Sequence, residues 1–190
     1  MNAVSSLRLM RKRGLIGAAL ALLFALSLGW PTQLQIPVAG AAPQDWNHDS
    51  FWAYPWGKSV VHKGIDIFAA KGSQVVAASA GIVLYQGEIP MGGVVVLILG
   101  PQWRLHYYAH LARSLVQSGQ LVTQGSALGA VGDSGNAKGK APHLHYSLLT
   151  LVPYPWRWDA SRQGWKKIFY LNPDPLLRPS RPHATAPKPD

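Results

Sequence analysis

The segment from Val60 to Leu151 consists of short runs of β-branched and aromatic residues that are separated by glycines. Such runs, bounded by glycine or proline, are typical of strands. The five clearest runs cover residues 74–77, 81–85, 94–99, 105–109 and 143–149. The chain also has 19 glycines and 15 prolines, which suits many turns better than a helical bundle. We therefore expect a mainly β fold, with one antiparallel β-sheet or sandwich-like domain.

The first residues have the pattern of an export signal. The basic residues Arg11-Lys12-Arg13 precede an uncharged apolar run, Gly14 to Trp30, and Ala39-Gly40-Ala41 offers a small-residue cleavage pattern. The apolar run is intermediate in length between a signal-peptide core and a membrane span of about 20 residues. We predict that residues 1–41 are a cleaved signal peptide or a retained signal anchor helix; the alternative is a buried helix of the domain.

Composition divides the rest of the chain. Residues 42–59 are rich in aromatic side chains and are expected to form a linker or edge segment, with a stacking platform for a sugar or peptide as the alternative. Residues 60–152 would form the domain itself. Residues 153–177, rich in Trp and Pro, would cover one of its edges, and residues 178–190 are expected to be a disordered, irregular tail.

Charge and cysteine content narrow the classes of function. The net charge is +10, and the N-terminal 41 residues hold four of the 18 basic residues and no acidic one. A basic surface favours an anionic partner, but no nucleic-acid motif accompanies it, so we expect no nucleic-acid partner. Because the chain has no cysteine, disulfides, thiol catalysis and cysteine zinc sites are excluded.

Two short motifs carry candidate metal ligands. His62 and Asp66 lie four residues apart, and His143 and His145 lie two apart. In an extended chain, side chains at even spacing share one face, so each pair can point to one side, with Gly64 leaving open space there. Two histidines and a carboxylate are a standard catalytic zinc set with one position left for water, although either motif alone is weak evidence.

The remaining histidines limit the choice of a general base. Glu88 is the only glutamate and there is no His-Glu-x-x-His motif, so a histidine is the better candidate. His110 lies at a strand end. His106 would share its face in a regular strand, and we expect it to be a solvent or core histidine. His48 and His183 fall in a loop and in the tail and receive no role.

The order of these motifs resembles the LytM/lysostaphin-type zinc metallopeptidases, which cut peptide bonds in peptidoglycan. The resemblance covers about residues 61–149 and includes 62–66, 80–83, 108–111, 129–135 and 142–145. It implies that His62, Asp66 and His145 bind Zn²⁺, that His143 is the general base, and that His110 holds the water or stabilises the oxyanion. Residues 54–59 depart from the family's arginine-bearing strand, which affects the shape of the groove.

The resemblance implies a zinc-dependent endopeptidase that hydrolyses peptide stems or cross-links of bacterial peptidoglycan. The protein would act in the cell envelope, in the periplasm or on the outer face of the inner membrane, with inner-membrane anchoring or an activator protein as further partners. The alternative function is a catalytically silent, wall-binding regulator of another hydrolase. A carrier-like β domain with fortuitous histidines is a third reading. The bond that is cut is left open.

Overall fold

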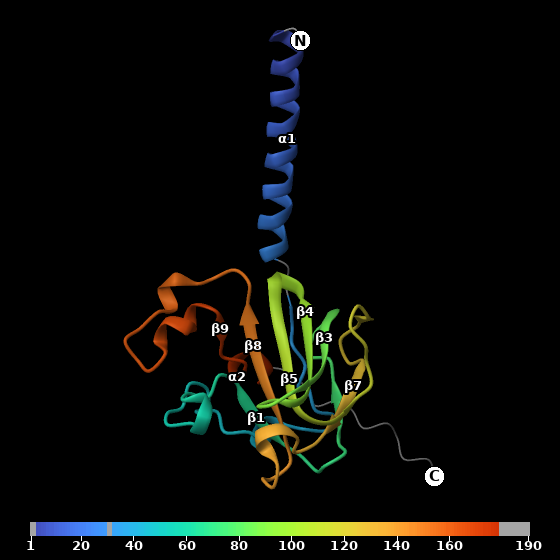
Figure 1. Cartoon of the computed structure of the whole chain (residues 1–190), viewed down its shortest axis with the longest axis vertical. Helices are drawn as coiled ribbons and strands as arrows, with labels where there is room; N and C mark the ends of the chain where they lie inside the picture. Colours follow the sequence, from blue (N-terminus) through green and yellow to red (C-terminus); the bar gives the residue numbers. More distant parts are fainter. Residues whose placement is uncertain (1–2, 30–31, 179–190) are drawn as a thin grey trace. The chain divides into compact units, whose positions relative to one another are not determined.

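The computed structural model describes residues 3–29 and 32–178, in two compact units that divide between Pro31 and Thr32. The first unit is one helix, α1 (Ala3–Leu28), shown in Figure 1. The side chains of its uncharged part are mostly exposed, including Leu15, Leu20 and Leu23. Among the described residues, no helix has the length and apolar character needed to cross a membrane. The export segment therefore stays a prediction.

The second unit is built on a single antiparallel sheet, which confirms the mainly β expectation (Figure 1). The strand order is β1-β8-β5-β4-β3-β6, with β9 on β8 and with β7 joining both β5 and β2. The strands are β1 (Ile65–Phe68), β2 (Gln74–Val76), β3 (Gly81–Ile89), β4 (Gly93–Gly100), β5 (Arg104–Ser114), β6 (Leu121–Val122), β7 (Ala127–Val131), β8 (His143–Thr150) and β9 (Tyr170–Leu171).

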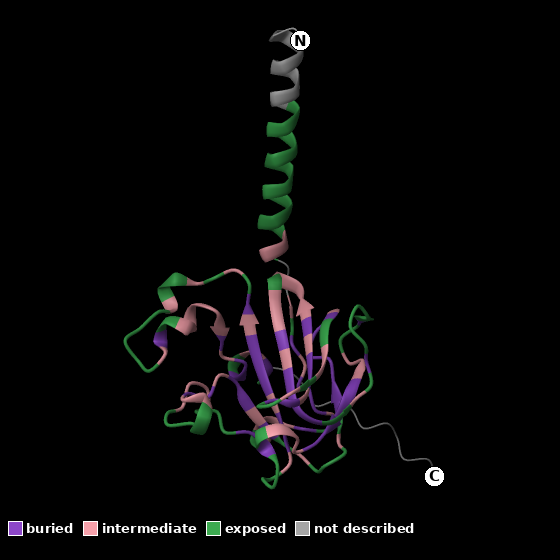
Figure 2. Cartoon of the chain, viewed as in Figure 1, coloured by how far each residue is buried: buried purple, intermediate pink, exposed green. Residues whose placement is uncertain are grey.

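The two long strands β5 and β8 form the middle of the sheet, where buried residues concentrate (Figure 2). Their side chains alternate between two faces, as a pleated strand requires. In β5, His106 and Tyr108 are buried on the core face, whereas Leu105 and Tyr107 line a groove on the other face. The sheet therefore separates a buried apolar core from an open groove.

Residues 32–41 belong to this core. Leu34, Ile36 and Val38 are all at most 4% exposed, and they pack with the main apolar cluster. The backbone is held as well, because Gln35 N donates to Ala78 O and Ala39 N donates to Gln74 O. Cleavage after residue 41 would remove this part of the core.

A chain that begins at residue 42 is expected to fold poorly compared with one that begins at residue 32. Burial of an aliphatic side chain contributes about 1.5–3 kcal/mol, so losing Leu34, Ile36 and Val38 would cost about 5–9 kcal/mol. That range is comparable to the whole unfolding free energy of a typical domain, about 5–15 kcal/mol. Urea unfolding of the two truncated chains measures the difference, and equal midpoints would contradict it.

Residues 153–177 surround the β9 edge of the sheet and end in the short helix α2 (Asp174–Leu177). Asp174 is buried and collects three partners: Trp46 Nε1 at 3.0 Å, His48 Nδ1 at 2.6 Å and Arg178 at 2.8 Å. These contacts join the aromatic segment to the C-terminal part of the unit and give His48 a structural position. Residues 179–190, including His183, lie outside the described residues.

His106, which is expected to be a solvent or core histidine, lies in the core. Its Nδ1 lies 2.7 Å from the Tyr146 hydroxyl, and its side chain is 1% exposed. Burial, followed by the charge of Arg104, lowers the pKa of His106 to about 3. His106 would share a face with His110 only in a regular strand, and β5 is irregular between them.

We expect His106 to make the fold less stable in acid. Its pKa is about 3 when folded and about 6.5 when unfolded, so the unfolded chain binds one more proton between those values. Stability should therefore decrease as the pH falls from 6.5 towards 3, by at most about 1.4 kcal/mol per pH unit from this residue. His106→Gln keeps a partner for Tyr146 and should lose this contribution. Urea unfolding with a chelator at pH 7, 5.5 and 4.5 compares the two slopes, and equal slopes would refute the assignment.

Candidate metal centre

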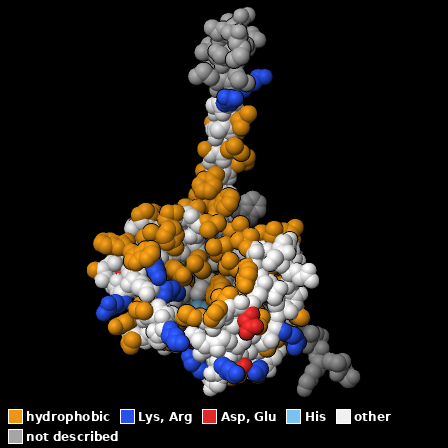
Figure 3. All heavy atoms as spheres, viewed as in Figure 1, with side chains coloured by type: hydrophobic (Ala, Val, Ile, Leu, Met, Phe, Trp, Pro, Cys, Tyr) orange, Lys and Arg blue, Asp and Glu red, His pale blue; other side chains and the backbone are white. Residues whose placement is uncertain are grey.

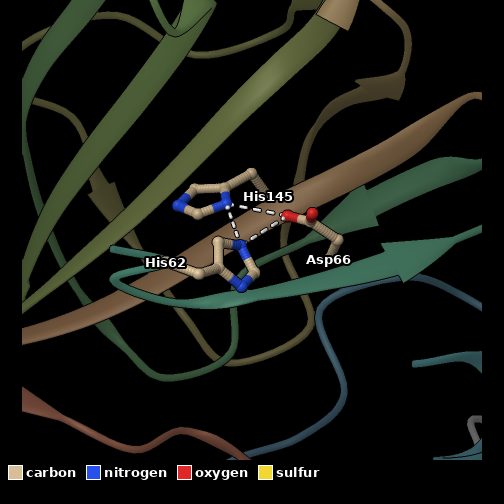
Figure 4. A group of neighbouring side chains, drawn as sticks. All are labelled: His62, Asp66 and His145. Carbon is tan, nitrogen blue, oxygen red and sulfur yellow. Dashed lines mark hydrogen bonds and ion pairs between the residues drawn. The ribbon is translucent and has the colours of Figure 1, made fainter. Parts of the chain in front are cut away.

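Three side chains from β1, from the residues just before it and from the neighbouring strand β8 converge at one point (Figure 4). His62 lies just before β1, Asp66 lies in β1 and His145 lies in β8, directly opposite Asp66 in the strand register. His62 Nε2 is 3.0 Å from Asp66 Oδ1 and 3.1 Å from His145 Nδ1, and His145 Nδ1 is 2.8 Å from Asp66 Oδ1. Pairing of β1 with β8 thus places the predicted ligands together.

The outer nitrogen of each imidazole is held by a neighbour. His62 Nδ1 donates to the Ser50 carbonyl oxygen at 3.0 Å, and His145 Nε2 lies 2.9 Å from Ser147 Oγ, which can accept its proton. In these tautomers, His62 Nε2 and His145 Nδ1 carry lone pairs and face the Asp66 carboxylate. Metal-binding histidines typically use their second nitrogen in this way.

This donor set fits a zinc ion. Three lone-pair atoms at 2.8–3.1 Å repel one another unless a proton or a cation lies between them. Zinc binds histidine nitrogen and carboxylate oxygen at about 2.0–2.2 Å in a tetrahedron, which places its ligands about 3.3 Å apart. The three atoms need to separate by only a few tenths of an ångström.

The electrostatics of the cluster favour an anionic Asp66. Burial by itself would raise the pKa of Asp66, but the adjacent imidazole rings of His145 and His62 outweigh it and hold the pKa below its usual value. Burial lowers the pKa of His145, and the neighbouring Asp66 opposes that change. An anionic carboxylate and a neutral imidazole are the protonation states that metal ligands require.

Gly64 has a different role from the one expected. It was expected to leave open space between His62 and Asp66, but a Cβ at this position would lie 2.4 Å from Tyr146 O and 2.7 Å from Ser147 Oγ. The absence of a side chain therefore lets β1 approach β8 closely. That approach is what brings Asp66 within hydrogen-bond distance of His145.

Two further histidines face the same point without joining the three-atom cluster. His143 Nδ1 donates to Ala141 O at 2.8 Å, and His110 Nδ1 donates to Ser134 O at 2.9 Å. In its neutral form each ring therefore has its lone pair on Nε2, and His143 Nε2 lies 3.9 Å from Asp66 Oδ1. Burial and the nearby His145 lower the pKa of His110 to about 4. The structure brings all five predicted site residues together.

A β-bulge turns His110 into the groove. Val94 pairs with Leu111 but Val96 pairs with Tyr108, so β5 carries one extra residue opposite β4. His110 has a φ of 64°, which is uncommon for a residue other than glycine, and its N–H donates to Gly92 O. In a regular strand its side chain would point into the core with His106 and Tyr108.

The cluster lies in a groove of about 1200 Å³. Figure 3 shows this face, with imidazole atoms visible at the bottom of a hollow that apolar and basic side chains border. Trp56 stacks on His62, with ring centroids 4.1 Å apart and planes 19° apart, and Lys63 holds this segment by donating to Ser59 O. The opposite wall includes Lys138 and Lys140.

Several residues at this site are not among those that the sequence predicts. Trp56 was grouped with other aromatics, and Ser50 acts through its backbone carbonyl, which no side-chain pattern reveals. Ser147 could have been found, because it lies two residues after His145 on the same face of β8. Tyr107 precedes the predicted Tyr108-Ala109-His110 motif. It could have been found because it lies two residues before Ala109 on the same face of β5, and both residues line the groove.

The chain is similar in sequence and fold to known peptidases. Residues 60–153 match the model described as Peptidase family M23. The L-Ala--D-Glu endopeptidase of Bacillus subtilis is 36% identical over 144 residues, which span 70% of this chain and 40% of the relative. Peptidoglycan DD-endopeptidase ShyC of Vibrio cholerae is 36% identical over 93 residues, which span 49% of this chain and 21% of the relative.

The catalytic domain of lysostaphin from Staphylococcus simulans has the same fold, with a TM-score of 0.57 at 24% identity over 72% of this chain and 95% of that domain. Residues 60–153 form a domain of peptidase family M23. The resemblance to LytM/lysostaphin-type peptidases is thereby confirmed. The chain matches less than half the length of the two curated relatives.

Proposed function

We propose that this chain is a zinc-dependent endopeptidase that hydrolyses peptide stems or cross-links of bacterial peptidoglycan. The observation that carries the proposal is the convergence of His62 Nε2, Asp66 Oδ1 and His145 Nδ1 at the base of a groove. Zinc, when bound there, supplies a Lewis acid that makes water a nucleophile near neutral pH and polarises a carbonyl group. The other site residues then transfer protons and orient the attacking water.

His143 is suited to be the general base. Its Nδ1 proton is committed to Ala141 O, so its Nε2 is free to take a proton from the attacking water. The same atom can return that proton to the leaving amine as the peptide bond breaks. The hydrogen bond to Ala141 also fixes the orientation of the ring before substrate binds.

His110 is suited to hold the attacking water. Because its Nδ1 donates to Ser134 O, its neutral ring presents a lone pair at Nε2 and accepts a hydrogen bond from water. Ser134 is itself fixed, since its Oγ donates to Leu111 O and accepts from Val94 N. This hydrogen bonding favours the water-holding role over stabilisation of the oxyanion.

The complete set of donors favours an enzyme over a silent wall-binding regulator, because a regulator does not require a metal site with two nearby proton acceptors.

We also propose that the protein acts in the cell envelope. The exposed apolar side chains of α1 support an export segment there, since soluble proteins rarely expose such a surface. The packing of residues 32–41 supports a start of the folded domain at about Thr32.

The test is release of soluble fragments from purified peptidoglycan by the purified chain, with the new peptide ends identified by mass spectrometry. Fragments should appear with zinc, disappear with a chelator and return when zinc is restored. The new ends would also identify the bond that is cut. Bound zinc with no release of fragments would favour the regulator instead.

A further inference from the structure

A second concave site lies at the β9 edge of the sheet, separate from the catalytic groove. Its volume is about 320 Å³. Successive residues of β9 point to opposite faces, so Tyr170 lines the catalytic groove and Leu171 lines this smaller cavity. The cavity is lined mainly by Arg104, Tyr154, Trp156, Arg157, Asn172 and Leu176.

Arg104 is a partly buried cation without a compensating group. Its Nε is buried and has no hydrogen-bond partner among the described residues. No aspartate or glutamate of residues 3–29 and 32–178 forms an ion pair with it. A buried guanidinium normally has a carboxylate or several acceptors, because removing its hydration costs free energy.

A second guanidinium lies in the same cavity. Arg157 is held in position by a hydrogen bond from its Nε to Lys167 O at 3.3 Å. Asn172 adds an amide: its Oδ1 accepts the Asp174 N–H, so its Nδ2 is the donor that remains. The cavity therefore combines donors for an anion with the apolar surfaces of Trp156, Tyr154 and Leu176.

We propose that this cavity binds a peptide carboxylate, with the adjoining residue of the peptide against Trp156. A guanidinium matches a carboxylate through two parallel hydrogen bonds, and such charge-assisted pairs are stronger than neutral ones. The aromatic and aliphatic walls suit a compact residue attached to the carboxylate. The source of the ligand would be a neighbouring peptide of the polymer whose bonds the groove cuts, and this part of the inference rests on the proposed function.

The test is calorimetric titration of the full chain with N-acetyl-alanyl-alanine, with its C-terminal amide and with inorganic phosphate. A chelator is present, so that no zinc in the catalytic groove can bind a carboxylate. The free acid should bind about 10–100-fold more tightly than the amide, because only the acid offers a charged acceptor. Equal binding of acid and amide would overturn the proposal, and phosphate binding as tight as the acid would overturn the peptide assignment.

Variants separate a binding role from a structural one. Arg104→Met should lose about 10-fold or more in affinity for the acid. Arg162→Met should bind normally, since Arg162 is an exposed arginine of residues 153–177 that contacts the Tyr54 ring and does not line the cavity. Without ligand, Arg104→Met should unfold in urea at the same or a higher midpoint, because it removes an uncompensated charge. A clearly lower midpoint with unchanged affinity would make Arg104 structural.

Binding is measured without zinc and without cleavage, so the two proposals can fail separately. Binding of the acid without release of fragments from peptidoglycan would support this site and contradict the proposed function. Cleavage of peptidoglycan together with equal binding of the acid and the amide would support the proposed function and contradict this site.

Discussion

His143→Ala is expected to keep its zinc and to lose about 10²–10⁴-fold in turnover, the usual contribution of a general base. The metal should stay because His143 Nε2 is 3.9 Å from Asp66 Oδ1 and is not one of the three clustered donor atoms. Turnover should fall because the neutral His143 ring presents the Nε2 lone pair next to the cluster, with its other nitrogen committed to Ala141 O.

The measurement is the rate of fragment release together with the zinc content of the same preparation. His48→Ala is a suitable control, because His48 is a partly exposed histidine that binds Asp174 and does not line the groove. The control should retain both zinc and activity. Near-normal turnover of His143→Ala would show that another group is the general base. Loss of zinc from this variant would show that His143 is a ligand.

Asp66→Ala and His145→Ala should each lose tight zinc binding and activity together. Loss of an outer partner of a metal ligand costs about 10–100-fold in affinity, so removal of a ligand should cost more than about 100-fold. The effect should be large at Asp66 because it supplies the one carboxylate and the negative charge of the cluster. A competition titration against a chelator of known affinity measures this loss.

Asp133→Ala is the matched control for Asp66→Ala. Asp133 is a partly exposed carboxylate after β7, where it pairs with Lys71 at 2.7 Å. Its removal should leave zinc affinity unchanged. Zinc that remains stoichiometric and tight in both Asp66→Ala and His145→Ala would show that the ligands lie elsewhere.

The strands could be predicted because local composition determines them. The expected runs at 94–99 and 143–149 correspond to β4 and β8 within a residue or two. The short strands β6 and β9 were not predicted, since two-residue strands carry almost no local signal and form only by pairing with neighbours. The segment 129–135, one of those that carry the resemblance, begins within β7.

The candidate site was predictable in its residues but not in its geometry. Even spacing along a strand suggests that His62 and Asp66 share a side, but only the register places Asp66 opposite His145. The bulge that turns His110 towards the groove depends on how β5 pairs with β4. The burial of Leu34 depends on the folded sheet, and an export signal read from local sequence does not reveal it.

The most direct test of the central claim is a crystal of the chain grown with zinc, with diffraction data collected on both sides of the zinc absorption edge. If the three residues bind zinc, one strong anomalous peak is expected about 2.0–2.2 Å from His62 Nε2, Asp66 Oδ1 and His145 Nδ1. His143 and His110 should lie beyond ligand distance from that peak. No peak at this position, or a peak bound by other residues, would contradict the account.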